Sequence, residues 1–203
     1  DYVFATTTLT IAEGATSTSI TLTAQSDNLD EVDEAVVIDI DVPTFAAESG
    51  EQQQKVTIKD VNVPAIVTLS VNKQFLDENV GTTSMATVRL TLDTISAKDI
   101  TVTLKKTPGV APLFPAKDVE DYTLATSTVV ITAGQSSTST IFQVTADGRN
   151  EHEETMTIEI DEVVGNGTKT TEVSGQKKTI TIKDGDPLPT VTIEALPVSI
   201  EEE

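Results

Sequence analysis

Three acidic stretches hold the residues of this chain that could do chemistry. Two are loops, running from Asp27 to Glu34 and from Asp147 to Glu154, and the third is Asp184-Gly185-Asp186. Side chains alternate along an extended backbone, so Asp184 and Asp186 share a face, and Gly185 lets the chain bend toward an ion. Calcium takes about six to eight oxygen ligands from flexible loops. These stretches therefore favour a calcium site, although solvated loop charges would explain the same pattern.

Other chemistries fit the sequence poorly. Neither acidic loop has the alternating Asp pattern and closing Glu of an EF-hand. His152 is the only histidine and lies in a charged loop, and no Gly-x-Ser-x-Gly elbow accompanies it, so we expect a solvated side chain rather than a catalytic triad. Gly165-Asn166-Gly167 predicts a hairpin turn and not a phosphate-binding loop. We expect that the chain is not an enzyme.

The balance of charge narrows the classes of partner. Lys and Arg number 13 against 33 for Asp and Glu, a formal net charge of -20. Such a surface repels phosphate backbones and anionic lipids, so we expect no nucleic acid and no direct membrane insertion. The charge would also keep a secreted protein soluble. The sequence has no Cys, which excludes disulfides and thiolate metal sites but does not indicate the cytosol.

The elements that must position these acids are indicated by an internal repeat. DYVFATTTLTIAEG, from Asp1, matches DYTLATSTVVITAG, from Asp121, so the repeat is about 120 residues long. VTIKD ending at Asp60 matches ITIKD ending at Asp184, and VTLSV from Val67 matches VTIEA from Val191. This is the size of a sandwich domain and too long for a solenoid repeat.

The phase of the repeat predicts three parts. Residues 1–62 are the later half of one module (the leading segment), residues 63–187 form a complete module (the central module), and residues 188–203 are the first strand of the next (the tail). Both ends look like cuts in a longer polypeptide. We expect the apolar face of the leading segment to be completed by further chain or by another copy, and Tyr2 and Tyr122 to be buried or half-buried at equivalent positions.

Short alternating segments predict strands throughout. Val67–Val71, Ala86–Leu92, Ile100–Leu104, Thr128–Ile131 and Thr155–Ile160 all alternate aliphatic residues with Thr, Ser or charged residues. Ala133-Gly134 and similar pairs separate them as turns. The fold class is therefore all-β, with tandem antiparallel Greek-key (immunoglobulin-like) β-sandwich modules.

In this order the motifs resemble the Calx-beta module, a family found in sodium–calcium exchangers and in large bacterial surface proteins. The resemblance rests on the Asp121-Tyr122 pair, the strand and turn from Val129 to Gly134, the acidic loop that leads into the strand at Glu151–Ile160, and the closing Thr181–Asp186. It spans the central module and recurs in the leading segment.

The resemblance implies calcium ligands at one end of each sandwich. In the central module they are Glu78, Asp147, the carbonyl of Arg149, Glu151, Asp184 and Asp186. In the leading segment they are Asp27, Glu31, Asp60 and Asn62, and in the tail Glu202. Two departures affect the number of ions: Pro115-Ala116-Lys117-Asp118 replaces the family's Asp-Gly-Thr-Ala stretch, and Asn62 stands where the central module has Asp186.

These observations predict a structural and adhesive segment of a long surface protein. The resemblance implies a large bacterial adhesin on the cell surface, used in attachment or gliding, whose partners are neighbouring modules of the same chain and a host or substratum surface. Calcium would lock the loops beside the linkers at Val61–Pro64 and Gly185–Pro189. Two alternatives remain, a module that binds a glycan or protein ligand and an intracellular calcium-sensing domain.

Overall fold

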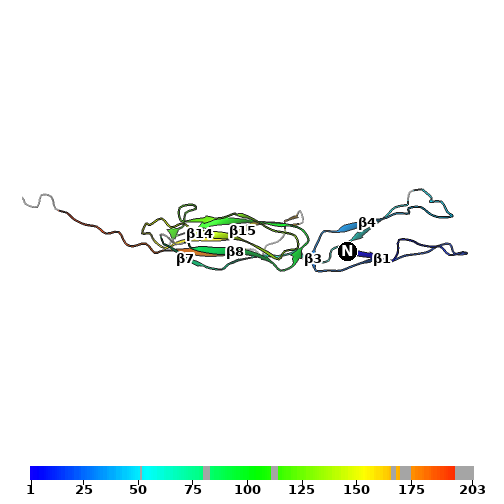
Figure 1. Cartoon of the computed structure of the whole chain (residues 1–203), viewed down its shortest axis with the longest axis horizontal. Coiled ribbons are helices and arrows are strands. Elements are labelled where there is room, and N and C mark those ends of the chain that lie inside the picture. The colour runs from blue at the N-terminus through cyan, green and yellow to red at the C-terminus, as the bar shows by residue number, and fades with distance from the viewer. Residues whose placement is uncertain (51, 80–82, 111–113, 166–167, 170–174, 195–203) are drawn as a thin grey trace, which may run out of the picture.

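The computed structural model describes residues 1–50, 52–79, 83–110, 114–165, 168–169 and 175–194. All secondary-structure elements among them are β-strands. The molecule is elongated: the leading segment lies at one end, the central module forms a compact sandwich, and the tail extends from the opposite end (Figure 1). The described residues include no helix that could cross a membrane.

Two sheets make up the central module. The strands of one sheet, in spatial order, are β12 (Tyr122–Leu124), β14 (Ser137–Val144), β8 (Met85–Leu92) and β6 (Val67–Val71). The strands of the other are β13 (Thr128–Ile131), β10 (Ile100–Pro108), β15 (Glu154–Gly165), β17 (Lys177–Asp184) and β7 (Phe75–Glu78). Two short strands, β11 (Phe114–Pro115) and β16 (Thr168–Lys169), also pair with β15.

The connectivity is that of an immunoglobulin-like sandwich. The opening segment contributes β6 to one sheet and β7 to the other, and the segment β12–β13 also changes sheets. The predicted all-β sandwich is confirmed, but not every strand pair is antiparallel as expected. β7 runs parallel to β17, with Leu76 opposite Ile182 and Glu78 opposite Asp184. A parallel pair arises here because the opening and closing segments of the module lie side by side, and β7 and β17 are not consecutive strands joined by a hairpin.

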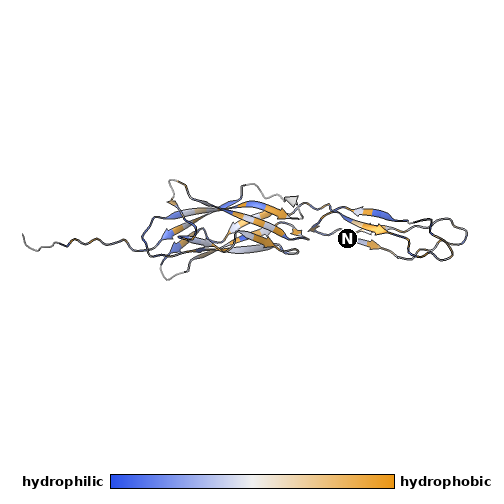
Figure 2. Ribbon diagram, turned by 90° about the horizontal axis from the view of Figure 1, so that it is seen from above, coloured by the Kyte–Doolittle hydropathy of each residue, from blue (hydrophilic) through white to orange (hydrophobic). Residues whose placement is uncertain are grey.

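The core lies between the two sheets and is mostly aliphatic. Ile100, Val102 and Leu104 alternate with exposed or half-exposed residues along β10 and are buried, as their spacing predicts. Hydrophobic and hydrophilic residues accordingly alternate along the strands of the central module (Figure 2). Two aromatic rings, those of Tyr122 and Phe142, stack within it at 4.9 Å between centroids. Burial of the Tyr122 ring, and after it the charges of Asp118 and Asp121, raises the pKa of its hydroxyl to about 12.

The free edge of β6 is held by a side chain. The carboxamide of Gln176 accepts a hydrogen bond from the amide of Leu69 at 2.7 Å and donates one to the carbonyl of Val67 at 2.6 Å. Because one carboxamide offers both a donor and an acceptor, it satisfies two backbone groups that would otherwise lack a strand partner. Gln176 thus ties β6 to the sheet that contains β17.

The leading segment repeats the later strands of the central module. Its strands are β1 (Tyr2–Phe4), β2 (Leu22–Ala24), β3 (Leu29–Asp30), β4 (Glu34–Ile38) and β5 (Gln54–Ile58). Tyr2 pairs with Ala24 as Tyr122 pairs with Val144, so the predicted equivalence of the two tyrosines is confirmed.

The burial predicted for both tyrosines is correct only for Tyr122. Tyr2 is 46% exposed, whereas Tyr122 is 1% exposed. In the central module Tyr122 lies between two sheets. In the leading segment β1 pairs only with β2 and β4 only with β5 among the described residues, so each layer has two strands and leaves the residues between the layers more exposed.

Turn predictions are confirmed where the structure describes them. Gly134 has a φ of 76°, a left-handed conformation that glycine adopts without strain. β15 and β16 pair antiparallel on either side of Asn166-Gly167, which itself lies outside the described residues.

The difference in burial gives a matched test. Ile158 is fully buried and the equivalent Ile38 is half-buried. Ile158→Ala should lower the free energy of unfolding of the central module by about 2–5 kcal/mol, because it leaves a cavity between two sheets. Ile38→Ala should cost less than about 1 kcal/mol. Urea denaturation of both variants measures the difference, and equal losses would contradict the weaker packing of the leading segment.

Candidate functional site

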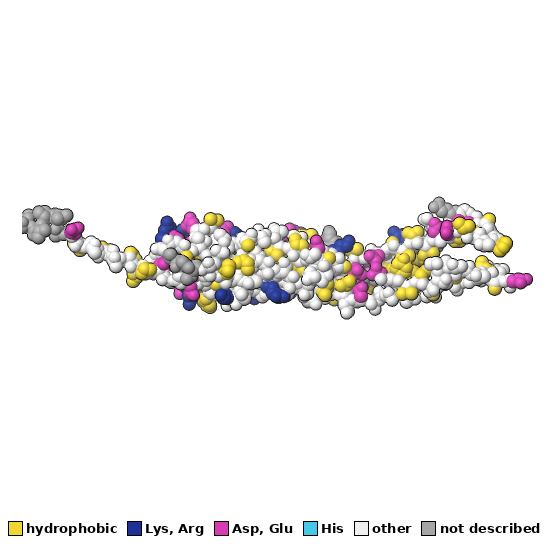
Figure 3. All heavy atoms as spheres, in the orientation of Figure 1, with side chains coloured by type: hydrophobic (Ala, Val, Ile, Leu, Met, Phe, Trp, Pro, Cys, Tyr) yellow, Lys and Arg dark blue, Asp and Glu magenta, His cyan; other side chains and the backbone are white. Residues whose placement is uncertain are grey.

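Three segments converge at the end of the central module that faces the tail. The parallel pairing of β7 with β17 places Glu78 opposite Asp184. The loop between β14 and β15 carries Asp147 and Glu151 to the same end. Segments that are far apart in sequence therefore bring their carboxylates to one place. Figure 3 shows acidic side chains among basic ones at this end, and a distinct acidic group beside the leading segment.

The first cluster contains three residues of the predicted ligand set. Carboxylate oxygens of Glu78, Asp147 and Glu151 lie within 4.8 Å of one another. Glu78 is 3% exposed, and its Oε1 atom has no hydrogen-bond partner among the described residues. Burial, followed by the negative charges of Asp147, Glu151, Asp121 and Asp184, raises the pKa of Glu78 to about 7. A buried, unpartnered oxygen that faces two further carboxylates is the arrangement that a hard cation stabilises.

A second cluster shares Glu151 with the first. Carboxylate oxygens of Asp121, Glu151 and Glu154 also lie within 4.8 Å of one another. Burial, and after it the hydrogen bond to the Asp121 carboxyl, raises the pKa of Glu154 well above its ordinary range. Its Oε2 atom is buried without a partner among the described residues. Because Glu151 belongs to both clusters, two cations could share one bridging carboxylate.

The sequence prediction missed Asp121 and Glu154 as ligand candidates. In the sequence Asp121 is a marker of the Asp-Tyr pair, and Glu154 closes the acidic loop. The recurrence of an acid beside the tyrosine, at Asp1 and Asp121, was a signal that could have indicated a role for it.

Asp184 fastens the acidic loop. Its Oδ2 accepts hydrogen bonds from the amide of Glu151 at 3.0 Å and from Asn150 Nδ2 at 2.7 Å, and its Oδ1 accepts one from the amide of Asp186 at 2.9 Å. Neither Asp184 nor Asp186 belongs to the carboxylate clusters. The Oδ2 atom of Asp186 is nevertheless buried without a partner among the described residues.

Arg149 contacts the first cluster through its side chain. Its Nε lies 3.2 Å from Asp147 Oδ2, and its amide donates to Asp147 Oδ1 at 2.8 Å. The role predicted for its carbonyl therefore stays a prediction. The side chain offers Asp147 a positive partner that a cation would compete with, and because both groups are partly solvated the ion pair contributes little.

Gly185 packs against the first strand of the site. A Cβ at this position would lie 1.9 Å from Asn79 Oδ1, and the Gly185 amide donates to the carbonyl of Glu78 at 3.1 Å. The sequence predicted that this glycine lets the chain bend toward an ion. The structure adds that the absence of a side chain lets the end of β17 lie close beside the end of β7.

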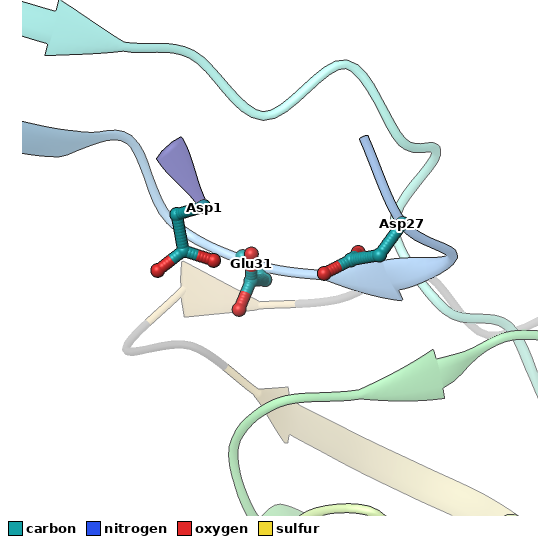
Figure 4. Close-up of side chains that lie close together, drawn as sticks. All are labelled: Asp1, Asp27 and Glu31. Carbon is teal, nitrogen blue, oxygen red and sulfur yellow. The ribbon is translucent and has the colours of Figure 1, made fainter. Parts of the chain in front are cut away.

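The leading segment has a smaller, more exposed cluster. Carboxylate oxygens of Asp1, Asp27 and Glu31 lie within 4.8 Å of one another, and Asp1 and Asp27 flank Glu31 (Figure 4). Partial burial, followed by the charge of Asp27, raises the pKa of Glu31. Asp1 was not in the predicted set. It occupies the position that Asp121 holds in the central module.

Asp60 and Asn62 fasten this loop, as Asp184 does in the central module. Asp60 Oδ2 accepts the amide of Glu31 and Oδ1 accepts the amide of Asn62, both at 2.9 Å. These hydrogen bonds lower the pKa of Asp60, with the Asn62 amide as the largest cause. Asn62 Nδ2 donates to the carbonyl of Leu29 at 2.6 Å, so its amide group closes the loop. The predicted ligand Glu202 lies outside the described residues.

The exposed aromatic residues do not form a platform of the kind that binds sugars. His152 is exposed, as predicted, and its ring stacks on Phe114 at 4.4 Å between centroids. Phe75 lies elsewhere, under Lys183 Nζ at 4.9 Å. Tyr122 and Phe142 lie in the core.

Fold and site together define an all-β sandwich module with clustered carboxylates at one end. No protein-family model matches the chain, and no curated protein matches it. Among solved structures it is similar to the apo form of the Calx CBD1 domain, with 15% identity and a TM-score of 0.47 over 61% of this chain and 100% of that one.

Two further structures are similar to part of the chain. CBD12 from CALX1.2 has 16% identity and a TM-score of 0.47 over 59% of this chain and 45% of that one. A candidate carbohydrate-binding protein from Bacteroides ovatus has 12% identity and a TM-score of 0.42 over 61% of this chain and 37% of that one. The chain thus spans less than half of each of these two, and we base the site on its own residues.

The raised pKa of Glu78 predicts how the protein responds to pH after chelation of metal ions. The folded state keeps a proton that the unfolded state releases between about pH 4.5 and about pH 7. Stability should therefore fall as pH rises through this window. Glu78→Gln should remove part of that fall and stabilise the chelated protein at pH 7.5 by about 1–3 kcal/mol. Urea titrations at pH 5 and pH 7.5 measure this, and a destabilised variant at pH 7.5 would contradict it.

Proposed function

We propose that the chain is a structural segment whose modules act as spacers and bind calcium at their ends. The observation that carries the proposal is the carboxylate of Glu78. It is buried, its Oε1 has no partner among the described residues, and it lies within 4.8 Å of two more carboxylates. Holding such groups together without a cation costs about 1–4 kcal/mol per close pair, depending on the local dielectric. A bound cation reverses that cost.

The donor set favours calcium over other cations. All candidate side chains offer oxygen, and the sequence has no Cys. Calcium accepts irregular sets of about six to eight oxygens, whereas magnesium requires a near-octahedral arrangement and retains its waters. Glu78, Asp147, Glu151, Asp121 and Glu154 would hold the ions, and Asp184 would hold the loop in place.

The junction after the leading segment links its acidic loop to the central module. β3 pairs in parallel with β9 (Ile95–Ser96) of the central module, and the carbonyl of Asp30 accepts the amide of Ala97 at 3.1 Å. The side chain of Asp30 accepts the amide of Ala65 at 3.2 Å. Because Asp30 lies between Asp27 and Glu31, an ion that orders this loop would also order the junction.

Surface location and adhesion extend this proposal. The repeat at about 120 residues and the net charge of -20 are consistent with a long, soluble array outside the cell. In that setting the partners are neighbouring modules and an external surface, and the chain is part of a large bacterial surface protein used in attachment or gliding. A signal peptide and many copies in the reading frame would support this, whereas flanking membrane helices would favour an intracellular calcium sensor.

Calcium should stabilise the folded chain. Extracellular sites have dissociation constants of about 0.1–1 mM, and a hundredfold excess over that constant contributes about 2.7 kcal/mol. We expect millimolar calcium to raise the melting temperature of chelator-treated protein by several degrees, and magnesium to do so much less. Differential scanning calorimetry measures both shifts.

Two matched variants test whether the calcium-induced shift in melting temperature arises at Glu78. Glu78→Gln should abolish most of the calcium-induced shift. Asp77→Asn makes the same change in charge one residue away, on an exposed side chain, and should leave the shift intact. Calcium that fails to move the melting curve of the parent chain would leave the acidic clusters as solvated loop charges and the chain as a passive spacer.

The junction can be tested separately. Asp30→Ala removes the hydrogen bond to the Ala65 amide. The distribution of interatomic distances from small-angle scattering should then broaden, because the leading segment and the central module can reorient. Asp33→Ala is the control, since Asp33 is exposed and lies outside the contacts with Ala65 and Ala97. If both variants scatter like the parent, Asp30 does not hold the junction.

A further inference from the structure

One outer face of the central module is nearly free of charge. It is the outer side of the sheet of β12, β14, β8 and β6 (the β14–β8 face), where exposed positions alternate with core residues. Most side chains that point outward there carry hydroxyls, as Thr68 and Ser139 do, and Met85 and Ile141 add apolar area. Arg89 is the only charged residue on these four strands. In a chain with 33 Asp and Glu, this face therefore differs from the average surface.

The outer face of the other sheet is charged. Lys105, Glu159 and Lys177 lie side by side across β10, β15 and β17, and Lys105 Nζ lies 3.1 Å from Glu159 Oε1. Lys183 and Asp77 lie opposite each other on β17 and β7. The carboxylate clusters of the central module lie at the end that faces the tail. Charges thus occupy one face and the ends of the sandwich, and the β14–β8 face is left almost without them.

The leading segment has the same kind of residue at the matching positions. Ser17, Ser19, Thr21 and Thr23 match the residues that point outward from β14, and none of them is charged. The uncharged face is therefore a feature of the repeat and not of one strand.

The composition of the β14–β8 face fits contact with another protein. The centres of such contacts are depleted of Lys, Asp and Glu and enriched in Met and Arg. Ile141 lies opposite Thr87, and Met85 lies one pair further along the same face. On the other side of Thr87, Arg89 Nη2 donates to Ser137 Oγ at 2.7 Å, which holds the guanidinium against the sheet. The face thus has a small apolar centre beside one fixed positive charge.

Charge favours a second copy of the chain as the partner. Each copy has a formal net charge of -20, so two copies repel each other wherever acidic surfaces meet. Along the β14–β8 face they can approach without that repulsion. The one charge there, on Arg89, is opposite in sign to the net charge of the incoming copy.

We propose that two copies of the chain associate side by side through their β14–β8 faces. Sheets that pack face to face lie about 10 Å apart, with their strands about 30° from parallel. Because both copies use the same surface, the contact is isologous and closes at the dimer. The contact needs no ion, so it is independent of calcium binding.

The size of the face indicates a weak contact. Four strands about 4.8 Å apart, with about eight residues at 3.3 Å each, give roughly 400–500 Å² per copy. A standard interface buries about 800 Å² per partner. A single central module should therefore form a dimer only at high concentration, whereas tandem modules that make the same contact together would add their contributions.

Sedimentation equilibrium of the full chain in chelator tests the association. Between about 10 µM and 1 mM, a range that covers weak contacts, the masses should follow a monomer–dimer equilibrium. Raising the salt concentration from about 0.05 to 0.5 M should strengthen the dimer, because salt screens the repulsion between two negatively charged copies.

Two matched variants locate the contact. Ile141→Asp puts a negative charge at the centre of the β14–β8 face and should weaken the dimer at least tenfold. Val130→Asp is the control, since Val130 is also β-branched and has a similar exposure, 43% against 37% for Ile141, but lies on the charged outer face of the other sheet. It should associate within about twofold of the parent. Circular dichroism checks that both variants are folded.

Crosslinking gives a second measurement, since the chain has no Cys of its own. Ser139 is exposed near the centre of the β14–β8 face, so a short bismaleimide should join Ser139→Cys to a second copy of itself. Thr179→Cys, on an exposed position of β17 on the other sheet, should stay monomeric under the same conditions.

Four outcomes would overturn the proposal. A chain that stays monomeric at both salt concentrations would leave the face to a different partner, such as a neutral glycan. Masses that rise past the dimer would exclude a single isologous contact. A dimer that salt weakens would depend on ion pairs, and a dimer that Ile141→Asp leaves intact would form through another surface, such as the exposed apolar residues of the leading segment.

Discussion

Repulsion among carboxylates at one end of a sandwich is the constraint on which the rest of this structure depends. Glu78 and Glu154 lie on buried strands and Glu151 lies on the loop between β14 and β15, so the fold holds the three carboxylates together, not any attraction among them. The apolar core provides the free energy that holds them there. The module therefore stores electrostatic free energy at the point where the chain leaves it, and a cation would convert that repulsion into a bond between loops.

The sequence predicted the fold well and the site in part. Period-two alternation and the repeat were sufficient for the strands, because a strand that buries one face leaves that pattern in its residues. The resemblance to the Calx-beta module, carried over residue by residue, implied Glu78, Asp147 and Glu151, and the fold brings these three together. The ligand role that it implied for Asp184 stays a prediction, because the oxygens of Asp184 face backbone amides and the Asn150 carboxamide, and the sequence does not show which way these groups point. Nor did spacing reveal that Glu154 turns toward Asp121.

The acidic loops of the leading segment and the central module are closed by similar hydrogen bonds from different positions. Asp30 of the leading segment stands where the central module has Asn150, and Asn62 stands where it has Asp186, so the aspartate and the asparagine have exchanged positions. In both loops the asparagine side chain closes the loop. Asn62 bonds Leu29, and Asn150 bonds Asp184 and Asp186. The exchange frees Asp30 to hold the Ala65 amide of the following module.

The parallel pairing of β7 with β17 also determines how the central module carries load. A chain pulled from both ends draws β6 and β7 toward the leading segment and β17 toward the tail. Since the two strands lie side by side and run in the same direction, the force acts along them, and all hydrogen bonds between Phe75–Glu78 and Thr181–Asp184 must break together. Antiparallel strands joined at a hairpin would instead open one bond at a time, so this module is built to resist shear.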